Sequence, residues 1–169
     1  MKKYYVKKRF IDLKDSYYVY NTEKDLLFYT RIANPFSKYG YDLWKTEDES
    51  LIATMYRKQD RKNVVFTIEK DEKEIARIQT NKGWTKHFFS IEPQGIHVVH
   101  NDSKLSYTLW QDDEELGQID TKLLRLSTTF TIELYPHAEQ LLYLFIYLII
   151  VIDKVDPSMK GLLFKRIPF

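Results

Sequence analysis

The feature that most constrains this chain is an uninterrupted apolar segment near its C-terminal end. Residues Leu141–Ile152 read LLYLFIYLIIVI, twelve residues without a charge. A helix of this length spans roughly 18 Å, because an α-helix rises about 1.5 Å per residue. The hydrocarbon core of a bilayer is about 30 Å thick, and polar residues flank the segment on both sides, with Glu139 before it and Asp153 after it. We therefore interpret the segment as a helix buried inside the protein.

A helix with no polar face must be covered by other elements on every side. We expect it at about residues 137–153, because Pro136 suits the first position of a helix and Glu139 complements the positive end of the helix dipole. Two alternatives remain open from the sequence: the segment lies at a membrane interface, or it forms a central strand.

Upstream of Pro136, apolar residues recur with the period of two that is typical of β-strands. The clearest run is Thr128–Tyr135, and Val64–Glu69 and Leu51–Met55 follow the same pattern. Polar clusters separate the runs at the spacing of hairpin turns, so we count about ten to twelve strands, followed after the helix by one short strand at residues 161–165. The predicted turns are Asn21–Asp25, Glu47–Glu49, Asp71–Lys73, Asn81–Gly83, Pro93–Gly95, Asn101–Lys104 and Asp112–Glu115.

Antiparallel strands followed by one fully apolar helix predict a mainly β fold: a closed antiparallel β-barrel of about a dozen strands around a central hydrophobic C-terminal α-helix. No linker or shift in composition interrupts the chain, so we expect a single domain over residues 1–169. The barrel would enclose the apolar helix on all sides, as its composition requires.

The Lys/Tyr-rich start, the phrase YYVYNTEKDLLFYTR and the C-terminal apolar helix together resemble the tubby C-terminal-like superfamily. More narrowly, the chain is similar to its LURP-one-related small bacterial and plant members and, distantly, to the phospholipid scramblases. The resemblance covers nearly the whole chain and implies a barrel threaded by the helix at 137–153. Tubby proteins bind phosphoinositides through basic side chains, whereas LURP-one-related proteins have no established activity. No Lys/Arg motif here aligns with the tubby lipid site, so no functional residue is transferred.

Composition excludes several classes of protein. With no Cys, the chain has no disulfide scaffold, thiol nucleophile or usual structural zinc site. A net charge of +2 argues against a nucleic-acid partner, so we interpret the 13 Tyr and the tryptophans Trp44, Trp84 and Trp110 as core residues. Lys7, Lys8 and Arg9 interrupt any apolar signal-peptide segment, so we expect a cytoplasmic protein, at most peripheral to a membrane.

Enzyme and metal signatures are absent from the sequence. It contains no GxSxG, HExxH, Walker or GxGxxG motif, so we expect no catalytic residue and no cofactor. His97 and His100 fall on opposite faces of one strand and cannot share a metal ion. The acidic run Asp112–Glu115 lacks the spacing of a calcium loop and is interpreted as a solvated hairpin turn.

Clusters of basic residues are the remaining candidates for a site. One interpretation is a surface that binds anionic lipid headgroups, since each Lys or Arg near an anionic membrane contributes about 1 kcal/mol to the binding free energy. The other interpretation is ordinary charge that keeps the protein soluble. Further basic residues occur at Lys2–Lys3 and Lys165–Arg166. The candidate headgroup-binding residues are Lys7, Lys8, Arg9, Arg57, Lys58, Arg61 and Lys62.

The leading functional hypothesis is a non-enzymatic binding module that recognises an anionic lipid, such as a phosphoinositide, or a protein partner. One alternative is a membrane-associated protein that inserts residues 141–152 into the bilayer. The other is a lipocalin-like carrier of a small apolar ligand, which requires the apolar helix to lie outside the barrel lumen.

Overall fold

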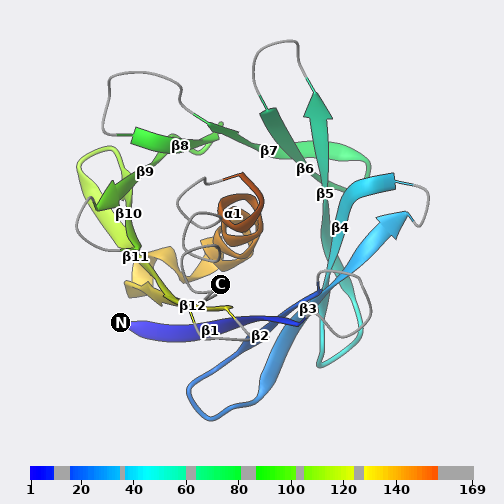
Figure 1. Cartoon of the computed structure of the whole chain (residues 1–169), viewed down its shortest axis with the longest axis horizontal. Helices are drawn as coiled ribbons and strands as arrows, with labels where there is room; N and C mark the ends of the chain where they lie inside the picture. Colours follow the sequence, from blue (N-terminus) through cyan, green and yellow to red (C-terminus); the bar gives the residue numbers. More distant parts are fainter. Residues whose placement is uncertain are drawn as a thin grey trace, which may run out of the picture.

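The computed structural model describes residues 1–9, 16–34, 37–59, 64–80, 87–101, 105–123 and 128–155. Within these ranges twelve strands form one closed antiparallel barrel, in which sequence neighbours pair and β1 closes the ring against β12 (Figure 1). The predicted closed barrel of about a dozen strands is therefore confirmed. The strands are β1 (Lys2–Arg9), β2 (Ser16–Tyr20), β3 (Leu26–Asn34), β4 (Ser37–Lys45), β5 (Leu51–Gln59), β6 (Val64–Lys70), β7 (Lys73–Thr80), β8 (His87–Glu92), β9 (Ile96–Asn101), β10 (Ser106–Gln111), β11 (Glu114–Leu123) and β12 (Thr128–Leu134).

Strand alternation decides which side chains fill the barrel. In β12, Phe130, Ile132 and Leu134 are fully buried, whereas the residues between them are only half-buried on the outer face. The closing pair repeats this arrangement, because Val6 of β1 lies opposite Phe130 and is also fully buried. The period of two in the sequence thus corresponds to an inner face packed on the core and an outer face toward solvent.

The apolar segment forms the helix at the centre of the barrel. A 3₁₀ turn, η1 (Pro136–Leu141), leads into α1 (Leu142–Val155), so the helical region begins one residue before the predicted 137–153 and ends two residues after it. Pro136 occupies the first turn, as expected, and the Ala138 amide donates to the Tyr135 carbonyl. The strands surround α1 (Figure 1). The interpretation of this segment as a buried helix is confirmed.

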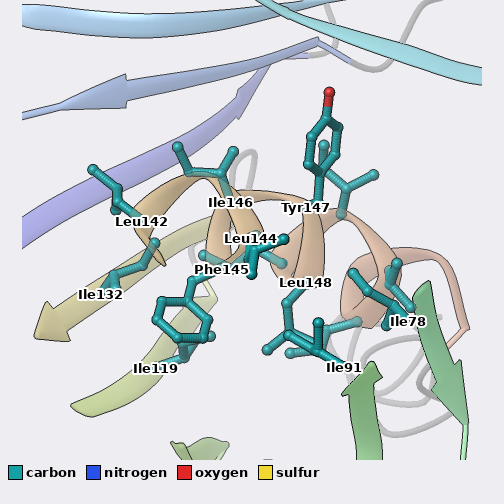
Figure 2. Close-up of a cluster of buried hydrophobic side chains, with 14 of the residues drawn as sticks. Ile78, Ile91, Ile119, Ile132, Leu142, Leu144, Phe145, Ile146, Tyr147 and Leu148 are labelled. Atoms are coloured by element: carbon teal, nitrogen blue, oxygen red, sulfur yellow. The ribbon is translucent and has the colours of Figure 1, made fainter. Parts of the chain in front are cut away.

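The helix packs against opposite walls of the barrel. In Figure 2, Phe145 points toward Ile119 of β11 and Leu148 toward Ile91 of β8, and all four side chains are fully buried. Tyr147 points away from Leu148, and its hydroxyl donates to the Ala53 carbonyl of β5 at 2.7 Å. A helix without a polar face needs apolar neighbours on every side, and the inner face of the barrel supplies them.

The position of α1 inside the barrel argues against both alternative functional hypotheses, the apolar-ligand carrier and membrane insertion. The lipocalin-like carrier is wrong for this fold, because α1 occupies the lumen in which an apolar ligand would bind. Insertion of residues 141–152 into a bilayer would require removing a helix that the barrel encloses. In the described part of the chain, no helix is long and apolar enough to cross a membrane.

Five of the predicted turns, all within the described residues, occur at one rim of the barrel, the rim at which the chain enters η1. Short turns follow β2, β4, β6, β8 and β10 there, and the acidic run Asp112–Glu115 contains one of them, as predicted. The predicted turn at 81–83, most of the predicted turn at Asn101–Lys104 and the predicted strand at 161–165 lie outside the described residues. The C-terminal end of α1 lies toward the opposite rim, where β1 ends and β2 begins.

Candidate anion-binding groove

The basic residues of β1 are divided between the two faces of the strand. Tyr4 and Val6 point into the barrel, so Lys8 is on the inner face while Lys7 and Arg9 are on the outer face. Three consecutive basic residues therefore do not form one surface, although the sequence places them side by side.

Lys8 is part of an interior ion pair. Its ammonium lies 2.8 Å from Asp153 of α1, and the two side chains are only 12% and 8% exposed. The Tyr17 hydroxyl of β2 donates to the same carboxylate oxygen at 2.5 Å. The strand parity that buries Val6 also turns Lys8 inward, so the structure removes Lys8 from the surface on which a headgroup could bind.

Lys7 and Arg9 lie together on the outside of the barrel, in a groove of about 410 Å³. The Lys7 ammonium is 5.5 Å from the centre of the Tyr20 ring, and the Arg9 guanidinium donates to the Tyr20 hydroxyl at 3.1 Å. The same guanidinium lies 4.7 Å from the centre of the Tyr18 ring. The two ring contacts are cation–π interactions, and together with the hydrogen bond they hold both cations against the wall of the groove. The groove is lined by Tyr5, Lys7, Arg9, Tyr20, Asn21, Thr22 and Lys24.

Lys24 is the third cation of the groove, and the turn between β2 and β3 places it there. The side-chain oxygen of Asn21 accepts hydrogen bonds from the amides of Glu23 and Asp25, each at 2.9 Å. Lys24 adopts a φ of 69°, and its amide donates to the Asn21 carbonyl at 3.2 Å. The left-handed conformation of Lys24 closes this turn, and Lys24 lines the groove together with Tyr5, Lys7 and Arg9 of β1. We did not identify Lys24 from the sequence, although it lies in a predicted turn.

The three cations of the groove form no ion pairs with carboxylates of the described residues, although Glu23 and Asp25 flank Lys24 in the turn. Elsewhere on β1, Lys2 pairs with Glu139 and Lys3 with Glu133, each at 2.9 Å, and these hydrogen-bonded pairs raise the pKa of both ammonium groups. Among the residues that the structure describes, no carboxylate forms an ion pair within 4 Å of Lys7, Arg9 or Lys24. The groove is therefore an exposed cationic site with tyrosine walls.

The other predicted headgroup residues do not join this groove. Arg57 shares a face of β5 with the buried Ala53 and Met55 and is half-buried, whereas Lys58 is exposed on the outer face. β2, β3 and β4 separate β5 from β1. Arg61 and Lys62 lie outside the described residues, as do Lys165 and Arg166.

The tryptophans correct one prediction from composition. Trp44 and Trp110 are half-buried and lie outside the core, so the prediction that they pack in the barrel interior is wrong for both. In β10, Leu109 points inward and the next residue, Trp110, therefore points outward; Trp44 follows the inward Leu43 in the same way. Trp84 lies outside the described residues.

The described residues offer no constellation for metal chemistry. His97 and His100 lie on opposite faces of β9, as predicted, because Val98 between them is buried and shares a face with His100. No group of three or more His, Cys, Asp or Glu side chains suited to a metal ion occurs in the described ranges. The groove itself is lined by amines, a guanidinium, phenols and an amide, which can bind an anion.

Comparisons with known proteins identify the architecture. No family model matches the chain, and no curated protein matches it in sequence. Its fold is similar to the X-ray structure of the Arabidopsis thaliana protein AT5G01750, with a TM-score of 0.60, 12% sequence identity and coverage of 92% of both chains. At this identity the similarity shows the fold alone, which in the described residues is a closed twelve-strand barrel with the C-terminal helix α1 inside it.

Proposed function

We propose that this protein is a non-enzymatic binding module that recognises the phosphate group of an anionic lipid in the groove formed by Lys7, Arg9 and Lys24. The observation that carries the proposal is the grouping of three exposed cations, without carboxylate partners in the described chain, around a hollow walled by tyrosines. We also propose membership of the tubby-like superfamily, on the sequence resemblance and the barrel with its central helix, and a cytoplasmic location peripheral to a membrane.

The chemistry of the groove suits a phosphate group. Lysine and arginine donate charge-assisted hydrogen bonds to phosphate oxygens, and the Tyr20 hydroxyl adds a neutral hydrogen-bonding group beside Arg9. The groove opens to solvent and its cations Lys7, Arg9 and Lys24 are exposed, so a headgroup could enter from a bilayer without burial of its acyl chains. A lipid also presents many copies of its headgroup at one surface, which favours weak individual contacts.

The test is flotation with vesicles of phosphatidylglycerol and phosphatidylcholine, compared with vesicles of phosphatidylcholine alone. We expect the wild-type protein to float only with the anionic vesicles. The Lys7→Ala/Lys24→Ala double variant should bind about 30-fold more weakly, since two lysines contribute about 2 kcal/mol near an anionic surface. Raising the salt concentration should weaken wild-type binding.

The matched control is the Lys70→Ala/Lys73→Ala double variant. It removes the same two charges, and both lysines are exposed at the hairpin between β6 and β7, across the ring from β1 and β2. We expect it to bind nearly as well as the wild type, and Lys58→Ala likewise. Equal losses in the two double variants would mean that net charge, not the groove, drives binding.

A second arm separates a lipid headgroup from a free phosphate. Inorganic phosphate at millimolar concentration is added to wild-type protein bound to the anionic vesicles at constant ionic strength. Retention on the vesicles supports a lipid as the ligand, because the groove then gains from the surrounding anionic surface. Complete displacement by phosphate would contradict the lipid assignment and identify a soluble phosphate as the ligand.

A further inference from the structure

A row of aromatic side chains crosses the outer wall of the barrel beside the groove. Tyr18 of β2 lies opposite Tyr29 of β3, and Tyr29 lies opposite Trp44 of β4. All three rings are half-buried on the outer face. Side chains directly opposite each other on neighbouring strands are in contact range, so the three rings form one continuous band, which we call the aromatic row.

Arginine side chains lie over this row. The Arg31 guanidinium is 5.1 Å from the centre of the Tyr29 ring and 6.0 Å from that of Trp44. Arg9, which lines the groove, lies over Tyr18 at the other end of the row. The aromatic row and the groove are therefore one continuous surface, which includes the cations Lys7, Arg9, Lys24 and Arg31.

The barrel does not need the aromatic row for its core, because α1 and the inward side chains already fill the lumen. Apolar exposure continues past Trp44: Leu51 of β5, its partner in register, is 47% exposed. Two carboxylates of this wall have local hydrogen-bond partners: Asp42, which lies opposite Arg31, accepts from the Thr54 hydroxyl at 2.6 Å, and Asp25 accepts from the Asn21 amide at 3.0 Å.

We propose that the aromatic row lies in the headgroup layer of an anionic bilayer while the groove holds a lipid phosphate, so that the wall from β1 to β5 faces the membrane. This inference rests on the proposed function and adds the orientation of the barrel. Tryptophan and tyrosine favour the membrane interface, because each ring has an apolar body and a polar end. Arginine and lysine extend their charged ends to phosphates while their stems cover apolar surface. The complementary partner of this surface is therefore a bilayer with anionic headgroups.

Single cysteines can test this orientation cleanly, because the chain has no Cys. Leu51→Cys places a probe beside the aromatic row, and Gln118→Cys places one on β11, across the ring from β5. Both positions are exposed and uncharged, so both variants should fold. Each is labelled with an environment-sensitive fluorophore and titrated with vesicles of phosphatidylglycerol and phosphatidylcholine.

We expect the Leu51→Cys probe to brighten several-fold and to be quenched by lipids brominated near the headgroup, while the Gln118→Cys probe changes little. Vesicle binding with an unchanged Leu51→Cys probe, or with equal changes at both positions, would overturn the orientation and leave the proposed function intact. Absence of wild-type binding to the anionic vesicles would overturn both.

A second variant separates the aromatic row from the charge of the groove. We expect Trp44→Ala to weaken vesicle binding at least fivefold without changing its dependence on salt, whereas Lys7→Ala/Lys24→Ala reduces that dependence. Retention of wild-type affinity in a folded Trp44→Ala protein, checked by its melting temperature, would contradict a role for the aromatic row.

Discussion

Leu148→Asp tests whether α1 is the core of the barrel. Leu148 is fully buried and points toward Ile91 (Figure 2). The substitution loses about 1.5–3 kcal/mol of apolar burial and adds several kcal/mol for a carboxylate without a partner, or for the protonation that avoids the charge. The sum is at least about 5 kcal/mol, which is comparable to the whole free energy of unfolding of a typical domain, about 5–15 kcal/mol. We expect the variant not to fold.

The assay is urea unfolding followed by circular dichroism. Leu148→Ala should fold, with a free energy of unfolding lowered by about 2–5 kcal/mol. The matched control is Leu51→Asp, the same chemical change at a position that is 47% exposed, and its stability should change by less than about 0.5 kcal/mol. A Leu148→Asp protein that remains soluble with the wild-type melting temperature would refute a helix inside the barrel.

Three further variants test other parts of the structure. Gly117 has a φ of +155°, and a Cβ there would lie 2.0 Å from the Glu133 carbonyl oxygen, so Gly117→Ala should lower the free energy of unfolding by roughly 2–5 kcal/mol, measured by urea unfolding. Burial raises the pKa of Tyr147 above its ordinary value of 10.0, so the neutral phenol stabilises the folded state fully below pH 10 and less as the pH rises further. Tyr147→Phe should therefore lose about 1–2 kcal/mol at pH 8 and show a smaller decline in stability above pH 10; parallel declines in both proteins would contradict this. Lys8→Met breaks an interior ion pair and should lower stability by about 3 kcal/mol, yet a folded sample should bind anionic vesicles like the wild type, and a selective loss of binding would place Lys8 in the site.

The barrel could be predicted from the sequence because a fully apolar helix and alternating strands are both satisfied by one fold, a barrel that encloses the helix. Leu141–Ile152 offers no polar face, and the alternating residues before it supply apolar inner faces that can enclose a helix. The turn at Asn21–Asp25 was also predictable, because Asn and Asp can hydrogen-bond to the backbone of their own turn.

The groove was only partly predictable. Lys7 and Arg9 were identified from their charge. The inward orientation of Lys8 could also have been predicted, because it shares the face of β1 on which Tyr4 and Val6 are buried. Lys24 was missed because its position depends on one left-handed residue in the turn and on the register shift between Val19 and Tyr20, which composition does not indicate.

The outer aromatics were misassigned for a different physical reason. Aromatic side chains suit the inner and the outer face of a strand, so their number alone does not decide which face they occupy. Trp44 and Tyr29 lie outside because the residues before and after them in the alternation, such as Leu43, are inside.

The most direct test of the central claim, that the groove formed by Lys7, Arg9 and Lys24 binds an anionic lipid headgroup, maps the contact without mutation. The uniformly ¹⁵N-labelled protein is titrated with a short-chain phosphatidylglycerol, and its backbone amide resonances are followed. We predict that the largest shifts occur in β1 from Tyr5 to Arg9, in β2 and in the turn at Asn21–Asp25, with little change in the hairpin between β6 and β7. Shifts centred on that hairpin, or spread evenly around the barrel, would contradict the account.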